Sequence, residues 1–147
     1  MPVHQAAVTV PEMVLVAALL LFYLAGDHLL DGPVRLLVRL RSRDSGARQR
    51  RAREESEGLT LYYRPTCPFC IRTLATVLRL GVPLRLRNIR REEGARQALV
   101  RHGGRQQVPC LHVPDLVENG EEHGEWRYES ADISRWLRDR FNASGTP

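Results

Sequence analysis

The hydrophobic positions near the start of the chain form one long run without a charged side chain. The run, MVLVAALLLFYLAG, covers Met13–Gly26. With its flanks, Val10–Leu30 has 21 residues, which as a helix with a rise of about 1.5 Å per residue match the hydrocarbon core of a bilayer. Glu12 would then lie near one interface and Asp27 near the other. The pattern predicts an apolar helix, over residues 1–32, that anchors the protein in a membrane.

Two other interpretations of this helix stay open. A cleaved signal peptide begins with basic residues, but residues 1–12 contain no Lys or Arg, and no small-residue cleavage site adjoins the apolar run. A helix that docks on a surface without spanning would suit the short uncharged part, which Asp27 and Asp31 follow closely. A single membrane span is the preferred interpretation.

The segment after the apolar run is basic. Residues 33–57 hold eight arginines against four acidic residues, a net charge of +4. Pro33–Arg41 could form a short helix at the membrane surface, and we expect the remainder to be a hydrophilic tether. An arm that binds nucleic acid is disfavoured because an apolar run adjoins the segment, so we expect a membrane and no nucleic acid as partner. Since basic flanks stay inside, the predicted location is the inner (cytoplasmic) membrane, single-pass, with the C-terminal domain facing the cytoplasm.

From residue 58 onward the pattern changes to short strands that alternate with helices. The predicted strands are Leu59–Tyr63, Val82–Asn88, Val108–Val113 and Trp126–Tyr128. Apolar residues at helical spacing predict helices that end at Gly81, that cover Glu92–His102 and that begin near Ser130, and Glu118–Glu125 predicts an acidic loop. The order is β-α-β-α-β-β-α, an α/β fold over residues 58–147.

Length and composition narrow the possible classes. The chain has 147 residues, enough for one ordinary domain with an appendage and too few for a two-domain enzyme or a full barrel. Hydrophobic residues are 43% and charged residues 27%, which excludes wholesale disorder. The net charge is +5, and all 22 basic residues are arginine.

The motif with the clearest chemistry is TCPFC, Thr66–Cys70, between the first strand and the first helix of this body. Pro68 suits the first helical position, because its missing N–H would be unpaired there. Cys67 then lies at the helix N-terminus, where unpaired amides and the helix dipole favour a thiolate, and Arg64 adds positive charge. Cys70, three residues on, lies on the same face and within disulfide reach. One activated thiol and one resolving thiol are what thiol–disulfide exchange requires.

Other roles for the cysteines are less favoured. A structural zinc site needs four ligands, but the sequence has no second CxxC and no HxxxH, so we expect no metal. Inert cysteines remain an alternative, while a structural disulfide is disfavoured in the cytoplasm. Cys110 is expected to be a small buried residue whose side chain turns away from the motif, although a third redox partner stays an alternative.

Residues 59–141 resemble a glutaredoxin. The segments that carry the resemblance are YYRPTCPFC, GRQQVP (Gly104–Pro109) and WRYESADISRWL (Trp126–Leu137). The Glu–Ser pair in the last of these is similar to that in the N-terminal domains of glutathione transferases. The resemblance implies a thioredoxin-like fold with a four-stranded mixed sheet, here preceded by an N-terminal apolar helix. A complete glutathione transferase is disfavoured, because only six residues follow Phe141.

The resemblance also implies roles for individual residues. Cys67 would be the nucleophile and Cys70 the resolving thiol. Arg64 would attract the glycyl carboxylate of glutathione, and Val108, before a cis Pro109, would pair its backbone with the cysteinyl part. Glu129 and Ser130 would hold the γ-glutamyl end at a helix N-terminus.

Together these observations predict a membrane-tethered, glutathione-dependent thiol–disulfide oxidoreductase of glutaredoxin type. Its CPFC motif would reduce protein disulfides or glutathionylated proteins, with glutathione as reductant or co-substrate. The alternative is a non-catalytic adaptor that binds glutathione or carries an iron–sulfur cluster. Because every proposed site residue lies beyond residue 57, we expect residues 58–147 alone to keep the thiol chemistry.

Overall fold

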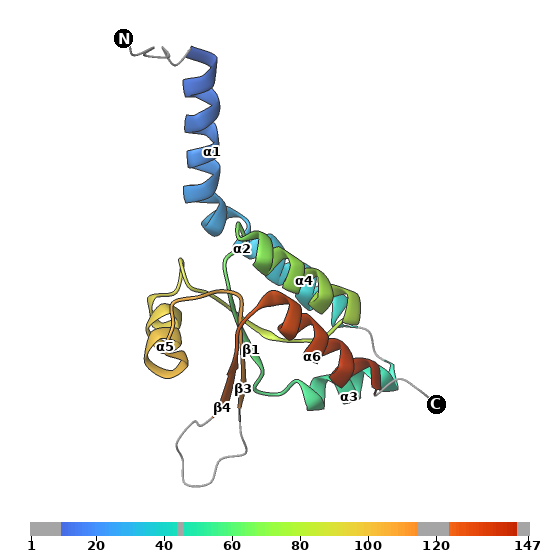
Figure 1. The fold of residues 1–147 in the computed structure, drawn as a ribbon. Helices are drawn as coiled ribbons and strands as arrows, with labels where there is room; N and C mark the ends of the chain where they lie inside the picture. Colours follow the sequence, from blue (N-terminus) through green and yellow to red (C-terminus); the bar gives the residue numbers. More distant parts are fainter. Residues whose placement is uncertain (1–9, 44–45, 115–123, 144–147) are drawn as a thin grey trace.

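The structure is a computed structural model and describes residues 10–43, 46–114 and 124–143. A four-stranded sheet has α4 and α6 on one side and α5 on the other, and α1 projects away from this body (Figure 1). The helices are α1 (Val10–Leu29), α2 (Asp31–Arg41), α3 (Ala47–Glu55), α4 (Pro68–Leu80), α5 (Glu93–Gly103) and α6 (Ser130–Ala143). The strands are β1 (Thr60–Tyr63), β2 (Arg85–Asn88), β3 (Cys110–Pro114) and β4 (Gly124–Arg127).

The sheet confirms the predicted fold class. Its strand order is β2-β1-β3-β4, with β1 parallel to β2 and antiparallel to β3, and with β3 antiparallel to β4. The body runs β-α-β-α-β-β-α from β1 to α6, which is the order expected for a thioredoxin-like fold. The strand β2 begins at Arg85, later than the predicted Val82, and Pro83, which has no N–H to donate, precedes it. Of the predicted acidic loop, residues 118–123 lie outside the described part of the chain.

The side chains of β1 alternate between two cores. Leu61 and Tyr63 point into the larger core, which α4 and α6 close. Tyr62 points into the smaller core on the other face, under α5. Cys70 belongs to the larger core and Cys110 to the smaller one, so the sheet separates these two thiols.

Within the basic segment 33–57, a helix covers Pro33–Arg41 as expected, but the remainder differs from the expected tether. The segment contains most of α2 and all of α3, and Val38 and Ala52 are buried in the larger core at 4% and 8% exposure. Val34 packs against the same core one helical turn before Val38, so α2 has a short apolar face despite its arginines. The segment is therefore packed on the body, and a domain boundary at residue 58 stays a prediction from the sequence.

The apolar helix α1 has almost no contact with the body over most of its length. Its large hydrophobic side chains from Val10 to Leu24 are about half exposed or more, whereas Gly26 and Asp27 near its end are buried. By length and composition this helix can cross a membrane, with a mean hydropathy of 1.7. Asp27, expected at a membrane interface, is enclosed by protein at 1% exposure, because partners from the body surround its carboxylate.

Candidate active site

Cys67 lies immediately before α4, as the motif predicts. Its backbone is extended (φ −81°, ψ 122°), Pro68 is the first helical residue, and the Ile71 N–H donates to the Cys67 carbonyl at 2.9 Å. The thiol is half-buried and therefore accessible to a reactant. Beside it, Phe69 and Ile71 are 59% and 52% exposed, so apolar surface adjoins the motif.

Cys70 differs sharply from Cys67 in its surroundings. It is fully buried in the larger core, and the Arg64 backbone N–H donates to its sulfur at 3.4 Å. Burial, reinforced by the neighbouring Cys67, raises the pKa of the Cys70 thiol far above its ordinary value. At neutral pH Cys70 therefore holds its proton, while Cys67 is the more accessible of the two thiols.

A pocket of about 280 Å³ gathers four of the residues that the resemblance implicates. Its lining residues are Phe69, Gln107, Val108, Pro109, Glu129 and Ser130. The Val108–Pro109 peptide bond is cis, as the resemblance implies. Phe69, between the two cysteines of the motif, is one of the lining residues, which places the pocket next to the motif.

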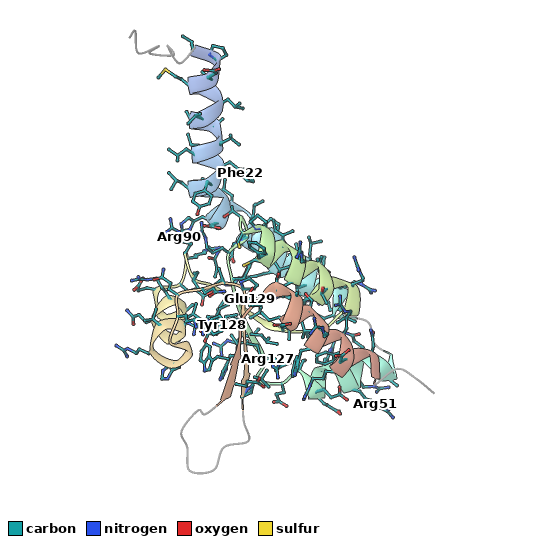
Figure 2. The ribbon with its side chains drawn as sticks, in the orientation of Figure 1. Phe22, Arg51, Arg90, Arg127, Tyr128 and Glu129 are labelled. Atoms are coloured by element: carbon teal, nitrogen blue, oxygen red, sulfur yellow. The ribbon has the colours of Figure 1, made fainter. Side chains whose placement is uncertain are left out.

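The start of α6 forms one wall of this pocket, and Figure 2 labels Glu129 there. Ser130 is the first helical residue, and the Ile133 N–H donates to the Glu129 carbonyl at 3.0 Å, so Glu129 occupies the N-cap position. Glu129 has a φ of 67°, rare for a residue with a side chain, and its carboxylate accepts a hydrogen bond from Gln107 at 2.9 Å. A helix N-terminus supplies unpaired N–H groups, which suit an anionic ligand.

Arg64 is the one predicted ligand-binding residue outside the lining of this pocket. Its guanidinium donates to Asp27 Oδ2 through Nε at 3.0 Å and through one terminal nitrogen at 2.8 Å. The other terminal nitrogen donates to the Tyr23 hydroxyl at 3.0 Å, and the guanidinium carbon lies 4.8 Å from the Tyr23 ring centre. The positive charge next to the motif is thus already paired with a carboxylate of α1.

The other oxygen of Asp27 binds the residue before Cys67. Asp27 Oδ1 accepts hydrogen bonds from the Thr66 hydroxyl at 2.7 Å and from the Thr66 backbone N–H at 3.3 Å. Sequence reasoning missed this contact because it treated α1 as a separate anchor. One signal was present: Asp27 and Asp31 are four residues apart at the end of an apolar helix, so both carboxylates share a face and need partners.

Asp31 is the second buried carboxylate that joins the N-terminal helices to the body. It is 1% exposed and accepts hydrogen bonds from the Tyr63 hydroxyl at 2.6 Å, Arg35 at 3.0 Å, Arg91 at 3.1 Å and Asn88 at 3.2 Å. Burial opposes ionisation, but the hydrogen bond from Tyr63 and the charge of Arg35 outweigh it and hold the pKa of Asp31 below its ordinary value.

Cys110 lies apart from this chemistry. It is fully buried on the opposite face of the sheet, and burial raises the pKa of its thiol to about 12. Within the described ranges, no group of three or more His, Cys, Asp or Glu side chains is placed to hold a metal ion.

Comparison with known proteins gives a family-model match within the body. Residues 59–117 match the family model for glutaredoxin. No curated protein and no solved structure matches the chain significantly. The matched segment runs through β1, the CPFC motif, β2, α5 and β3, whereas Glu129 and Ser130 lie beyond it. Residues 59–117 are therefore similar to a glutaredoxin domain, in line with the resemblance noted from the sequence.

Proposed function

We propose that this glutaredoxin domain is a glutathione-dependent thiol–disulfide oxidoreductase tethered to a membrane by α1. Its substrates would be protein disulfides or glutathionylated proteins. The observation that carries the proposal is the asymmetry of the CPFC motif: Cys67 is accessible at the start of α4, while Cys70 is buried one turn later. A pocket next to the motif supports it, because a small thiol could bind there.

The proposed reaction begins with the Cys67 thiolate. It attacks one sulfur of a mixed disulfide between a protein and glutathione, a new S–S bond joins Cys67 to glutathione, and the protein leaves as a thiolate that takes up a proton. A second glutathione thiolate then attacks the glutathione sulfur, which releases oxidised glutathione and restores Cys67. With a protein disulfide as substrate, Cys67 first forms a mixed disulfide with one protein sulfur and releases the other as a thiol. Cys70 then loses its proton and attacks the Cys67 sulfur, which releases the first protein sulfur as a thiol. Two glutathione molecules reduce the resulting Cys67–Cys70 disulfide and leave as oxidised glutathione.

We assign most of glutathione binding to the pocket. The backbone of Val108, before cis Pro109, would pair with the cysteinyl part, and Glu129 and Ser130 would hold the γ-glutamyl end. Arg64 would bind the glycyl carboxylate only by exchanging Asp27 for it, because its guanidinium is already paired. The contribution of Arg64 is therefore expected to be smaller than that of the pocket.

The proposed location is the inner (cytoplasmic) membrane with the domain on the cytoplasmic side. Eight arginines follow α1 between residues 33 and 57, and residues 1–12 contain none. Basic segments stay on the cytoplasmic side, where anionic headgroups also attract them. In intact cells, a thiol reagent that cannot cross this membrane should leave Cys67 unlabelled, and rapid labelling would contradict the orientation.

Reduction of a glutathionylated peptide by the full chain in detergent tests the activity. Glutathione-dependent turnover is expected, with complete loss in Cys67→Ser and little change in the matched variant Cys110→Ala, since Cys110 is buried on the other face of the sheet. Ser130→Ala should raise the KM for glutathione more than kcat falls. A brown, iron-containing protein without turnover would favour the cluster-carrying adaptor instead.

A further inference from the structure

We propose that the CPFC site is held at the level of the lipid headgroups, so that its protein substrates are disulfides or mixed disulfides close to where a client chain leaves the bilayer. The inference rests on the proposed oxidoreductase function and on α1 as a membrane span. It goes beyond both, because a flexible tether would let the domain reach clients far from the membrane. The described contacts show a rigid joint instead.

The first part of this joint connects α1 directly to the residues that flank Cys67. Asp27 accepts two hydrogen bonds from Arg64 and two from Thr66, the residue immediately before Cys67. Next to it, a Cβ added at Gly26 would lie 2.7 Å from the Thr66 methyl carbon, so the helix and the active-site loop are in close contact. Any movement of α1 relative to Cys67 would break these contacts.

The second part of the joint fixes the direction of the helix. Asn88, at the end of β2, donates to the Asp27 carbonyl at 2.7 Å and to the Asp31 carboxylate at 3.2 Å. The Tyr63 hydroxyl, at the end of β1, donates to Asp31 at 2.6 Å. The Asp27 carbonyl near the end of α1 and the Asp31 carboxylate at the start of α2 are thus bonded to the ends of two strands, so both sides of the α1–α2 junction are held on the body.

The length of helix between the membrane and this joint is short. Leu24 is 52% exposed and belongs to the apolar surface of α1, and Asp27 follows three residues later, a rise of about 4.5 Å. One headgroup layer is about 5–7 Å deep, the difference between the whole bilayer and its hydrocarbon core divided between two sides. With Leu24 at the edge of the hydrocarbon, Thr66 and Cys67 therefore lie within the headgroup layer or at its outer limit.

The residues around the joint have the chemistry of this layer. Tyr23, of the type that favours membrane interfaces, binds Arg64 through its hydroxyl and its ring. Arg90 and Arg91 are 48% and 53% exposed at the side-chain level and can meet lipid phosphates. Figure 2 shows Arg90 and Phe22 near the same end of α1, whereas Arg51 lies at the far end of the molecule. The exposed Phe69, beside Cys67, suits the boundary with hydrocarbon.

A site at this depth selects clients by position. A client sulfur must reach Cys67 within bonding distance for the exchange, and the rigid joint prevents Cys67 from moving outward to meet it. Cysteines within a few residues of a membrane exit are within reach. Cysteines held tens of ångströms above the membrane on a rigid segment are not.

Depth-dependent fluorescence quenching in liposomes tests the placement without any need for activity. A fluorophore is attached to Cys67 in the full-length variant Cys70→Ser, Cys110→Ala, and the lipids carry nitroxide groups on their headgroups. The matched control carries the fluorophore at Arg51→Cys in a chain without the three native cysteines. Strong quenching at position 67 and little at position 51 is expected. Absence of quenching at position 67 would overturn the inference.

Two glutathionylated client peptides then test the substrate class. Both contain the same membrane-spanning segment, but in one the cysteine follows the membrane exit directly and in the other about ten prolines raise it by about 31 Å. In liposomes the near cysteine should be reduced at least about 10-fold faster, and in detergent the rates should be similar. Equal rates in liposomes would overturn the inference and leave the proposed function intact. No reduction of either peptide in detergent would instead contradict the proposed function, and the quenching would still decide the placement.

Discussion

Arg64 donates two hydrogen bonds, at 3.0 and 2.8 Å, to a single carboxylate oxygen of Asp27, a residue 37 positions earlier in the chain. The pair joins the end of an apolar helix to the loop that presents the reactive thiol. It also compensates the positive charge that the sequence places three residues before Cys67. One contact thus affects three properties: the position of the loop, the charge available to the proposed glutathione ligand and the attachment of α1.

A double-mutant cycle measures this pair. Asp27→Asn and Arg64→Gln should each destabilise the fold, because each leaves a partly buried charged partner. The free energy of unfolding should fall less in the double variant than the sum of its falls in the two single variants, with a coupling free energy of about 1–2 kcal/mol. Unfolding in detergent with urea, followed by tryptophan fluorescence, gives the three values, and strict additivity would mean that the pair does not interact.

Loss of the Asp27 carboxylate should also affect the binding of glutathione. In Asp27→Asn the Arg64 guanidinium loses its carboxylate partner and becomes available to the glycyl carboxylate. The KM for glutathione should fall in this variant, and Asp132→Asn, an exposed carboxylate on α6, is the matched control. A KM that rises, with kcat unchanged, would mean that Asp27 supports glutathione binding.

The ionisation of Asp31 makes the stability of the fold depend on pH. Because its folded pKa is below the unfolded value of about 3.9, its ionised form stabilises the fold above about pH 4, and this contribution is lost as the pH falls through the folded pKa. Asp31→Asn should lower the free energy of unfolding at pH 7 by about 2–3 kcal/mol and flatten its decline below pH 4. Urea unfolding at a series of pH values checks this. An unchanged decline of the free energy of unfolding below pH 4 would contradict it.

The three cysteines should react in a fixed order. Cys67 is half-buried, whereas Cys70 and Cys110 are fully buried and burial raises their pKa values, so both remain protonated thiols near neutral pH. Iodoacetamide at pH 7.5 should modify Cys67 first, and the other two only after unfolding. Peptide mass spectrometry over time identifies the sites, and early modification of Cys110 would show that its face of the sheet opens.

Truncation separates the anchor from the packed helices. The sequence alone suggested that residues 58–147 would suffice, but this deletion removes Val38 and Ala52 from the larger core and leaves the Tyr63 hydroxyl without Asp31. Loss of one buried valine contact and one buried hydrogen bond costs about 3 kcal/mol, a large part of an ordinary stability. A chain that begins at Tyr23 keeps these contacts, so its melting temperature should be well above that of residues 58–147.

Membrane extraction tests α1 itself. Leu20 is 58% exposed near the middle of the apolar surface, and an arginine there costs about 2.5–3.5 kcal/mol on insertion scales. The unaltered protein should stay in the membrane pellet through high salt and carbonate, and Leu20→Arg should weaken insertion while Glu12→Gln does not. Release of the unaltered protein by salt alone would show that the helix only docks on the surface.

The sequence by itself determined the parts of this protein that depend on near neighbours in the chain. Spacing of three residues and one proline sufficed to place Cys67 at a helix start and Cys70 one turn later, and alternating or helical periodicity gave the order of strands and helices. The uncharged run predicted α1. The resemblance of three short segments to glutaredoxins further implicated four residues, which the fold brings into one pocket: Val108, Pro109, Glu129 and Ser130.

Only the tertiary structure decided what Asp27, Asp31 and the basic segment do. The partners of Asp27 are 37 and 39 positions away, and no local period records which side chain a distant loop presents. The arginines of α2 suggested a helix at the membrane surface and those of α3 a solvated tether, because the apolar residues that these helices bury in the core, such as Val38 and Ala52, are too few to reveal a buried face. Val38 and Ala52 are buried because the larger core offers them a complementary surface, and that surface exists only after β1, α4 and α6 have packed.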